Sequence, residues 1–385
     1  MALLRMPPNC ADTSSSTYFP TVCVVECYIK SNIVKEIETM KTKTAFYSLT
    51  LIVGLLLFGT GYFLHRRVAG NLLQSQRDVY KTRLRVSGST TNITITGPTI
   101  ERTTVEPVVN PHLFNFTIRN QAACFNRSNS NGELFLVLLV KCAPFEKLDR
   151  EQIRKTWGGV EEVLGRRVLT MFLLGESTDP IIRKQIQEED STFHDLIQED
   201  FIDNYKNLTC KNMMGLKWVS MYCPQTSFVV SVDADMVINI VTLVKRLSTM
   251  PKTNFAEGHL RTDTPIIRKK KHKCFVPKEE WADNLYPPFL MGACYAMSRD
   301  AVVSVFDVSK YIPFLRLDDV FVGICLTKAG VHMRYSPLYQ QYVSVENALK
   351  RGIGIGIAHN RDHLNQPALK LWHKMVGSQI QDMSK

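Results

Sequence analysis

The sequence lacks the short motifs by which common hydrolases and small zinc domains are identified. It has no Gly-x-Ser-x-Gly segment to form a nucleophile elbow, and no His-Glu-x-x-His segment to place two metal-binding imidazoles on one helix face. It contains 10 cysteines but no Cys-x-x-Cys pair, so a structural zinc site is not indicated. These absences argue against hydrolases of those classes and against a zinc-stabilised module.

The composition shows little of the bias that marks disordered or nucleic-acid-binding proteins. The chain has 385 residues, of which 45% are hydrophobic and 22% charged, enough for a globular domain with appendages. The formal net charge is +11, but Lys and Arg are spread along the chain. The densest basic run, residues 268–273, is interpreted as a solvated loop or a basic edge facing an acceptor. We expect no nucleic-acid partner.

A membrane-spanning helix is predicted over residues 44–65. Residues 45–64 carry no charge, with Lys41 and Lys43 before them and His65-Arg66-Arg67 after them. Twenty helical residues span about 30 Å, the thickness of a hydrocarbon core. A cleaved signal peptide is the alternative, but the apolar stretch is too long for one and lacks a small-x-small exit site.

The acceptor sequences for N-glycosylation give the orientation of this helix. The Lys and Arg counts on its two sides are nearly balanced and do not decide it. All four Asn-x-Ser/Thr sites follow the helix: Asn92, Asn115, Asn126 and Asn207. We therefore expect a single-pass protein with a cytosolic amino terminus and a luminal body.

Seven cysteines then lie in an oxidising compartment, where disulfides persist. They are Cys124, Cys142, Cys210, Cys223, Cys274, Cys294 and Cys325. An odd number leaves at least one of them unpaired or used between chains. The spacing alone does not give the pairing.

Four segments are predicted along the chain. We expect a cytosolic tail over residues 1–43, the membrane helix over 44–65, a luminal stem over 66–130 and a globular domain over 131–385. The stem is rich in Thr, Ser, Asn and Pro and has no helical periodicity, as is typical of a linker. Met1 and Met40 are both candidate start sites.

Apolar runs alternate with helical patterns in the globular domain. Residues 134–140, 168–174 and 228–232 have the continuous apolar character of strands buried on both faces. Residues 210–222 and 241–247 have helical spacing. The alternation predicts an α/β domain with a mostly parallel central sheet, in which ligands bind beyond the carboxyl ends of the strands.

Two acidic pairs are the candidates for chemistry. Asp233 and Asp235 follow the strand at 228–232, where two carboxylates can hold a divalent cation against a diphosphate. The alternative for this pair is a polar turn or helix cap. Asp318 and Asp319 form the second pair, which could remove a proton or could cap the helix that follows.

A series of motifs resembles the β-1,3-glycosyltransferases of glycosyltransferase family 31. The resemblance covers roughly residues 132–375, and the motifs occur in one order. They are Ile153–Gly158, Phe172–Gly175, Glu199–Thr209, Asp233–Asp235, Tyr286–Pro288 with Gly292 and Tyr295, and Leu317–Gly323. Six ordered motifs make a chance match very improbable.

The resemblance implies a GT-A-type nucleotide-sugar-binding domain that depends on Mn²⁺ and a UDP-sugar donor. The implied reaction is inverting transfer of galactose, or of GalNAc or GlcNAc, to the 3-hydroxyl of a glycan on a lipid or protein. Inversion needs one carboxylate to take the proton of the acceptor hydroxyl while a cation neutralises the departing diphosphate. The implied location is the Golgi membrane, as a single-pass type II protein whose catalytic domain is luminal.

The resemblance also assigns roles to the acidic residues. Asp319 matches the catalytic base, and Asp318 stands where the family more often has Glu. Asp235 matches the direct metal ligand, and Asp233 the residue that contacts the ribose or a metal-bound water. His359 resembles the late histidine that completes metal binding, although a lone His is more often structural.

Further residues are candidates for binding the nucleotide. Arg154 and Lys155 supply cations for phosphate, and Trp157 an aromatic face for the base, although a core position is the stronger alternative for Trp157. Asp200 and Lys211 are candidates on the donor side. Cys294 stands where the family more often has glycine, which leaves the shape of the pocket there open.

Two other classes of function compete with the enzyme. A catalytically inactive luminal glycan-binding protein or chaperone could retain the fold, but it would be free to lose Asp233, Asp235 and Asp319, which are all present. A metal-dependent hydrolase of sugar nucleotides would release UDP equally with and without an acceptor. The sequence does not specify the donor sugar, the acceptor or the oligomeric state.

Overall fold

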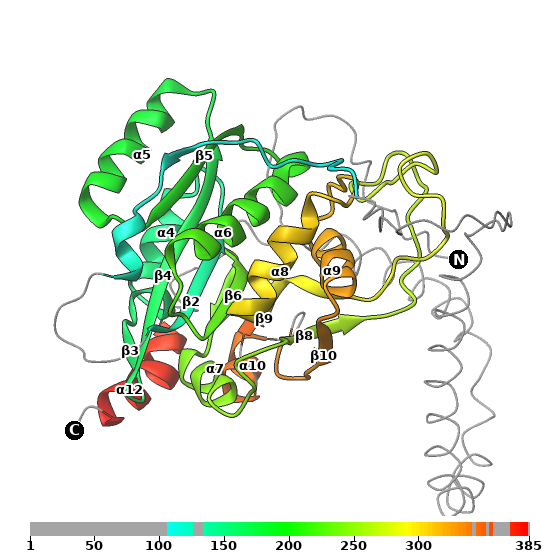
Figure 1. The fold of residues 1–385 in the computed structure, drawn as a ribbon. Coiled ribbons are helices and arrows are strands. Elements are labelled where there is room, and N and C mark those ends of the chain that lie inside the picture. Colours follow the sequence, from blue (N-terminus) through cyan, green and yellow to red (C-terminus); the bar gives the residue numbers. More distant parts are fainter. Residues whose placement is uncertain (1–105, 126–133, 341–343, 352–353, 357–369, 384–385) are drawn as a thin grey trace, which may run out of the picture. The chain divides into compact units, whose positions relative to one another are not determined.

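A computed structural model describes residues 106–125, 134–340, 344–351, 354–356 and 370–383 (Figure 1). The predicted tail, the membrane helix and most of the stem lie outside these residues, as do Asn92, Asn126 and His359. No helix among the described residues is long and apolar enough to cross a membrane.

In the described part of the chain, nine strands form one sheet in the order β1-β5-β4-β2-β6-β9-β8-β10, with β3 paired to β4. The four central strands are parallel, as the apolar runs predict. Strand β9 runs antiparallel to both neighbours, so the sheet as a whole is mixed. The strands are β1 (Phe116–Ile118), β2 (Leu134–Lys141), β3 (Glu162–Val163), β4 (Arg166–Glu176), β5 (Leu196–Ile202), β6 (Phe228–Asp233), β8 (Phe255–Arg261), β9 (Phe289–Ser298) and β10 (His332–Tyr335).

The central strands are apolar because both of their faces are covered. Along β2, Val137 and Leu139 join one hydrophobic cluster, whereas Leu136, Leu138 and Val140 join the other. This period of two follows from the alternation of side chains across a strand. Two cores therefore lie on opposite faces of one sheet.

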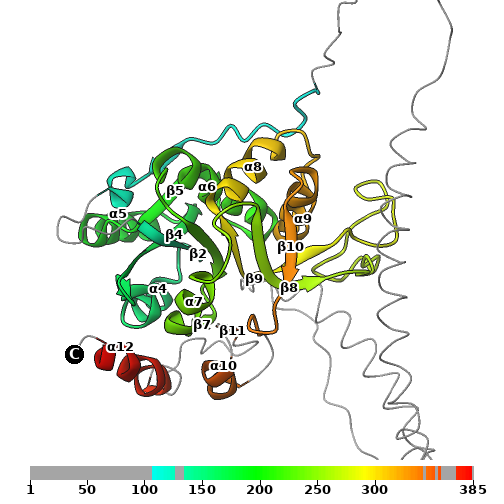
Figure 2. The same cartoon turned by 60° about the horizontal axis from the view of Figure 1, so that its bottom comes forward.

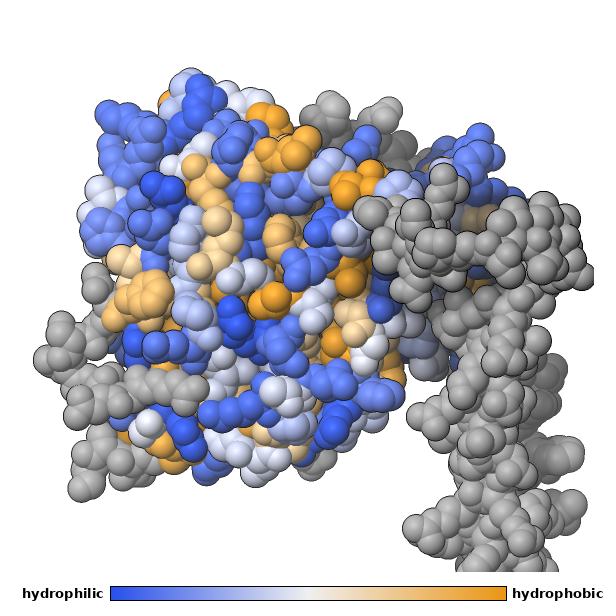
Figure 3. Space-filling model, viewed as in Figure 1, coloured by the Kyte–Doolittle hydropathy of each residue, from blue (hydrophilic) through white to orange (hydrophobic). Residues whose placement is uncertain are grey.

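Helices cover both faces (Figures 1 and 2). One core includes residues of α6 (Leu208–Tyr222), α8 (Arg299–Ser309) and α9 (Asp318–Lys328). The other includes residues of α4 (Lys147–Arg154), α5 (Pro180–Phe193), α7 (Ile240–Leu247) and α10 (Val345–Arg351). On the face drawn in Figure 3, hydrophilic residues gather over α5 and hydrophobic ones are scattered.

Short elements complete the fold. Strands β7 (Met236–Ile238) and β11 (Gly354–Gly356) form a second, two-stranded sheet. The remaining turns and short helices are η2 (Gln121–Cys124), η3 (Trp157–Gly159), η4 (Tyr205–Asn207), η5 (His373–Gly377) and α12 (Ser378–Met383).

Residues that the sequence assigns to the stem contribute to this body. Strand β1 pairs antiparallel with β5, and Cys124 forms a disulfide with Cys223 at the end of α6. The sequence did not indicate that this segment joins the sheet, because its composition is polar and a short edge strand needs few apolar residues.

Cys142, Cys210, Cys294 and Cys325 are buried free thiols among the described residues.

Two of the predicted glycosylation sites lie within the described residues. Asn115 is exposed, and its side-chain amide donates to Asp200 at 3.2 Å. Asn207 is partly buried, and its amide donates to the carbonyl of Ile202 at 2.9 Å. Asn115 is therefore the more accessible of the two, and the use of either site stays a prediction.

Candidate active site

The first acidic pair lies at the carboxyl edge of the parallel strands. Asp233 is the last residue of β6 and is opposite Lys141, the last residue of β2. Asp235 follows in the turn before β7. Both residues are buried, with Asp233 at the end of the strand and Asp235 in the turn that follows it.

The carboxylate of Asp233 is short of partners. Within the described chain neither of its oxygens accepts a hydrogen bond. The ammonium of Lys141 lies 3.1 Å from Oδ1, which is ion-pair distance without hydrogen-bond geometry. Burial raises the pKa of Asp233 to about 6 although Lys141 opposes the shift. Burial, with Asp233 and Glu146 nearby, raises the pKa of Asp235 well above its ordinary value.

These features fit a cation site. A buried carboxylate with free lone pairs is stabilised by a divalent ion, and hard cations prefer such oxygens. The described residues contain no group of three or more His, Cys, Asp or Glu side chains placed to hold a metal. Asp233 and Asp235 would thus supply two ligands, and the third residue of the predicted set, His359, lies outside the described residues.

The second acidic pair opens helix α9. Asp318 and Asp319 are its first two residues, where the helix dipole favours negative charge. Asp318 accepts hydrogen bonds from Lys141 at 2.9 Å and from Asn212 at 3.1 Å. The N–H of Val320 donates to Asp319 at 2.8 Å. Burial and then the charge of Asp318 raise the pKa of Asp319 to about 7, although the hydrogen bond from Val320 opposes the shift.

Lys141 joins the two pairs, and the sequence analysis did not identify it. Its ammonium contacts Asp233, Asp318 and the carbonyl of Gly292 at 2.9–3.1 Å. Burial alone would lower the pKa of Lys141, but the two carboxylates outweigh burial and raise it well above its ordinary value. The signal in the sequence is a single lysine that ends the apolar run of β2.

Lys211 is the predicted donor-side residue that the structure brings to this site. Its ammonium donates to the carbonyl of Cys142 at 2.5 Å and pairs with Asp203 at 2.8 Å. Burial raises the pKa of Asp233 and of Glu146, and the charge of Lys211 opposes this rise in both groups. Lys211 therefore adds positive potential to the carboxyl edge.

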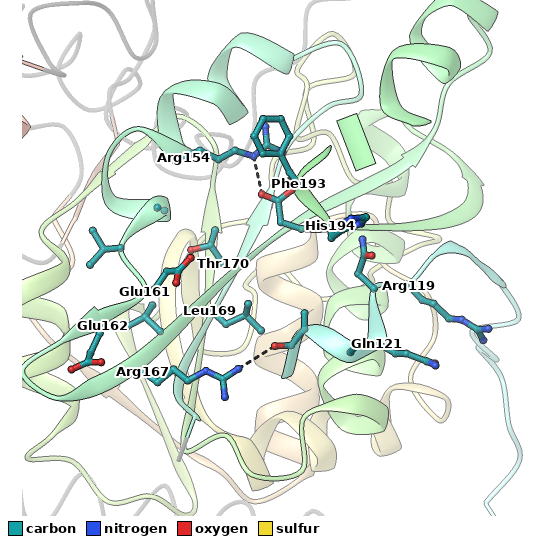
Figure 4. A pocket seen from close by; sticks show the side chains of 18 residues that line it. Arg119, Gln121, Arg154, Glu161, Glu162, Arg167, Leu169, Thr170, Phe193 and His194 are labelled. Carbon is teal, nitrogen blue, oxygen red and sulfur yellow. Dashed lines mark hydrogen bonds and ion pairs between the residues drawn. The ribbon is translucent and has the colours of Figure 1, made fainter. Parts of the chain in front are cut away.

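The structure does not bring Arg154 to the acidic pairs. Helix α4 follows β2 and returns along the sheet, so its last residue lies towards the amino ends of the strands. There Arg154 pairs with Asp195 at 2.8 Å and with Glu189 at 2.7 Å. It lines a cavity of about 1140 Å³ that contains none of the candidate acids (Figure 4).

The other nucleotide candidates also lie apart from the acids. Trp157 is fully buried in the core on the α4 face, as its alternative interpretation predicts. Lys155 is exposed beside it. Asp200 is exposed on β5 and accepts a hydrogen bond from the backbone N–H of Asn115 at 3.0 Å. Nothing in their contacts points to a nucleotide.

Comparison with known proteins gives the family. Residues 148–337 match the family model described as galactosyltransferase. Human β-1,3-galactosyltransferase 1 is 36% identical over 227 residues, which cover 58% of this chain and 68% of the relative. Human β-1,3-galactosyltransferase 5 is 40% identical over 200 residues, which cover 52% and 64%.

A solved structure of the galactosyltransferase LgtC, in complex with donor and acceptor sugar analogues, matches the chain with 8% sequence identity. The match covers 63% of this chain and 95% of the LgtC chain, with a TM-score of 0.33. The segment that matches the family model, residues 148–337, carries both acidic pairs. The chain belongs to the galactosyltransferase family and is an enzyme related to the β-1,3-galactosyltransferases of glycosyltransferase family 31.

Proposed function

We propose that the protein is an inverting β-1,3-glycosyltransferase that moves galactose, or GalNAc or GlcNAc, from a UDP-sugar to the 3-hydroxyl of a glycan on a lipid or protein. The observation that carries the proposal is the meeting of Asp233, Asp235, Asp318 and Asp319 around Lys141 at one edge of the sheet. Residues 44–65 would anchor the enzyme in the Golgi membrane, with residues 131–385 as its luminal GT-A catalytic domain.

Each acidic pair has its own task in this mechanism. Asp319 takes the proton of the acceptor hydroxyl as its oxygen attacks the anomeric carbon, and the bond to UDP breaks on the opposite side. Asp233 and Asp235 would hold Mn²⁺, which supplies positive charge for the departing diphosphate. Lys141 forms ion pairs with both Asp233 and Asp318 and so links the metal-binding pair to the pair that contains the base.

Loss of the metal ligand is expected to stop transfer. We predict that Asp235→Asn lowers kcat/KM by roughly 10²–10³-fold, the scale of losing one charge-stabilising group at a reacting centre. Chelation of divalent cations from the wild-type enzyme should have an effect at least as large, and added Mn²⁺ should reverse it. Calorimetric titration of UDP with Mn²⁺ checks the same ligand without turnover. Transfer that persists in a chelator would remove this role of Asp235.

The pH dependence follows from Asp319. A carboxyl whose pKa is raised to about 7 is protonated below that pH and becomes a base as the pH rises through it. We therefore predict that kcat/KM for the acceptor falls about tenfold per pH unit below pH 7 and is level above it. UDP affinity, measured over the same range, separates this effect from loss of donor binding. A profile that is flat between pH 5 and pH 7 would contradict the assignment.

The competing functions are separated by one assay. The luminal domain is incubated with Mn²⁺ and a panel of UDP-sugars, with and without a library of glycan acceptors, and UDP release is measured. A transferase releases UDP in proportion to the product formed and only slowly without acceptor. A sugar-nucleotide hydrolase releases UDP equally in both conditions, and an inactive glycan-binding protein releases none.

A further inference from the structure

The face of α9 that bears Asp319 packs against the chain just before β9. Residues four apart lie on one face of a helix, so Gly323 is on the same side as Asp319. A Cβ added at Gly323 would lie 2.8 Å from the carbonyl oxygen of Pro288 and 2.4 Å from Cβ of Phe289. The connection between β8 and β9, residues 262–288, therefore ends beside the candidate base, and Figures 1 and 2 both show it next to α9.

Tyr286 stands at the base of this connection with an unused hydroxyl. Its N–H donates to the carbonyl of Thr264 at 2.9 Å, and its ring meets Phe289 edge-on at 6.4 Å. The side chain is only 4% exposed, and its hydroxyl has no partner in the described part of the protein. Burial, and then the charge of Asp319, raise the pKa of Tyr286. A buried hydroxyl without a partner is destabilising, so a ligand that supplies one is favoured.

Trp281 adds a second aromatic ring with an unused donor. Its ring centroid is 6.2 Å from that of Tyr286, and the two planes are tilted by 50°. The side chain is partly buried, and its indole N–H has no acceptor among the described residues. Arg268 fixes this segment, because its guanidinium donates to the carbonyls of Trp281 and Asp283 at 2.6 Å.

These features define the chemistry of a ligand. Two aromatic rings offer apolar surface, and an O–H and an N–H offer two directed hydrogen bonds. A pyranose matches this combination, because one of its faces exposes C–H groups while its rim carries hydroxyls. The two aromatic side chains carry no positive charge, so they do not themselves supply the cations that the phosphates of UDP require.

We infer that Trp281 and Tyr286 form the subsite for the acceptor sugar, with the indole ring under its C–H face and the Tyr286 hydroxyl bound to a rim hydroxyl next to the reacting one. This inference rests on the proposed transferase function. It gives the β8–β9 connection the task of presenting the 3-hydroxyl to Asp319 and of selecting the acceptor.

Kinetics with a methyl β-galactoside as acceptor test the subsite. Tyr286→Phe is expected to raise the KM for this acceptor about tenfold, the scale of one lost hydrogen bond, with a smaller change in kcat. Trp281→Ala should raise it at least as much, and Trp281→Phe should recover part of the loss because it restores a ring. The affinity for UDP with Mn²⁺ should stay within about twofold of the wild type, because the proposal gives Tyr286 and Trp281 contacts with the acceptor only.

Leu285→Ala is the matched control, because Leu285 is adjacent in sequence and its side chain is 46% exposed. An acceptor KM that is unchanged in both aromatic variants overturns the inference. A donor KM that rises while the acceptor KM stays constant overturns it as well, because the subsite would then hold the donor sugar.

Direct binding separates this inference from the proposed function. Saturation-transfer NMR of the methyl β-galactoside with the UDP–Mn²⁺ complex reports occupancy without turnover. A wild-type signal that Tyr286→Phe and Trp281→Ala weaken supports the subsite even if no transfer occurs. Equal signals in all three proteins overturn it even if transfer is confirmed.

Discussion

Asp319→Asn is expected to abolish sugar transfer and to leave the fold intact. Asparagine keeps the shape of the side chain and can still accept the hydrogen bond from Val320, but it cannot take a proton. Loss of a positioned general base lowers the rate by roughly 10²–10⁴-fold. Measurement of kcat with a saturating UDP-sugar and acceptor checks the prediction. Calorimetric UDP binding should remain within about twofold of the wild type, because the cation that binds the diphosphate is assigned to Asp233 and Asp235.

Asp307→Asn is the matched control for this experiment. Asp307 lies on the neighbouring helix α8 and is exposed, so the same chemical change there should leave kcat unaltered. Asp318→Asn is a second comparison, because Asp318 is bound to Lys141 and its loss should act on stability as well as on rate. Full activity of Asp319→Asn would show that Asp319 is not the base, and Asp318 would then be the next candidate for that role.

The sequence predicted the central sheet and the position of both acidic pairs. Strand β6 is recognisable because it is a continuous apolar run that ends in Asp233, and such runs are local properties of the chain. Asp319 is recognisable because its motif, Leu317–Gly323, resembles the family pattern in which this position is the base. Both features depend on residues close together in sequence, so they can be recognised without a structure.

The contacts that assemble the site depend on residues far apart in sequence. Lys141 and Asp318 are separated by 177 positions, and no local pattern predicts that they meet. Arg154 shows the reverse case. Its position in a motif suggested phosphate binding, but it is bound to Asp195, 41 residues away, beside a cavity that none of the candidate acids lines. Ion pairs formed by tertiary packing are the part of the site that a single sequence does not reveal.

Lys141→Met is expected to destabilise the fold strongly. Methionine fills a similar volume but leaves Asp233 and Asp318 buried without their common cation. Removal of one partner from a buried ion pair typically costs about 3–5 kcal/mol, because the remaining charge is uncompensated. Denaturant unfolding of the luminal domain measures this loss as a lower midpoint at an unchanged slope.

Lys184→Met provides the comparison for the same substitution at an exposed pair. Lys184 and Glu188 are 3.8 Å apart on the surface of α5, where such a pair contributes at most about 0.5 kcal/mol. Addition of UDP with Mn²⁺ should raise the midpoint more in Lys141→Met than in the wild type, because a bound cation supplies the positive charge that the lysine supplied. Equal midpoints for Lys141→Met and Lys184→Met would mean that the lysine does not hold the two acidic pairs together, and the link between metal binding and proton removal would have to lie elsewhere.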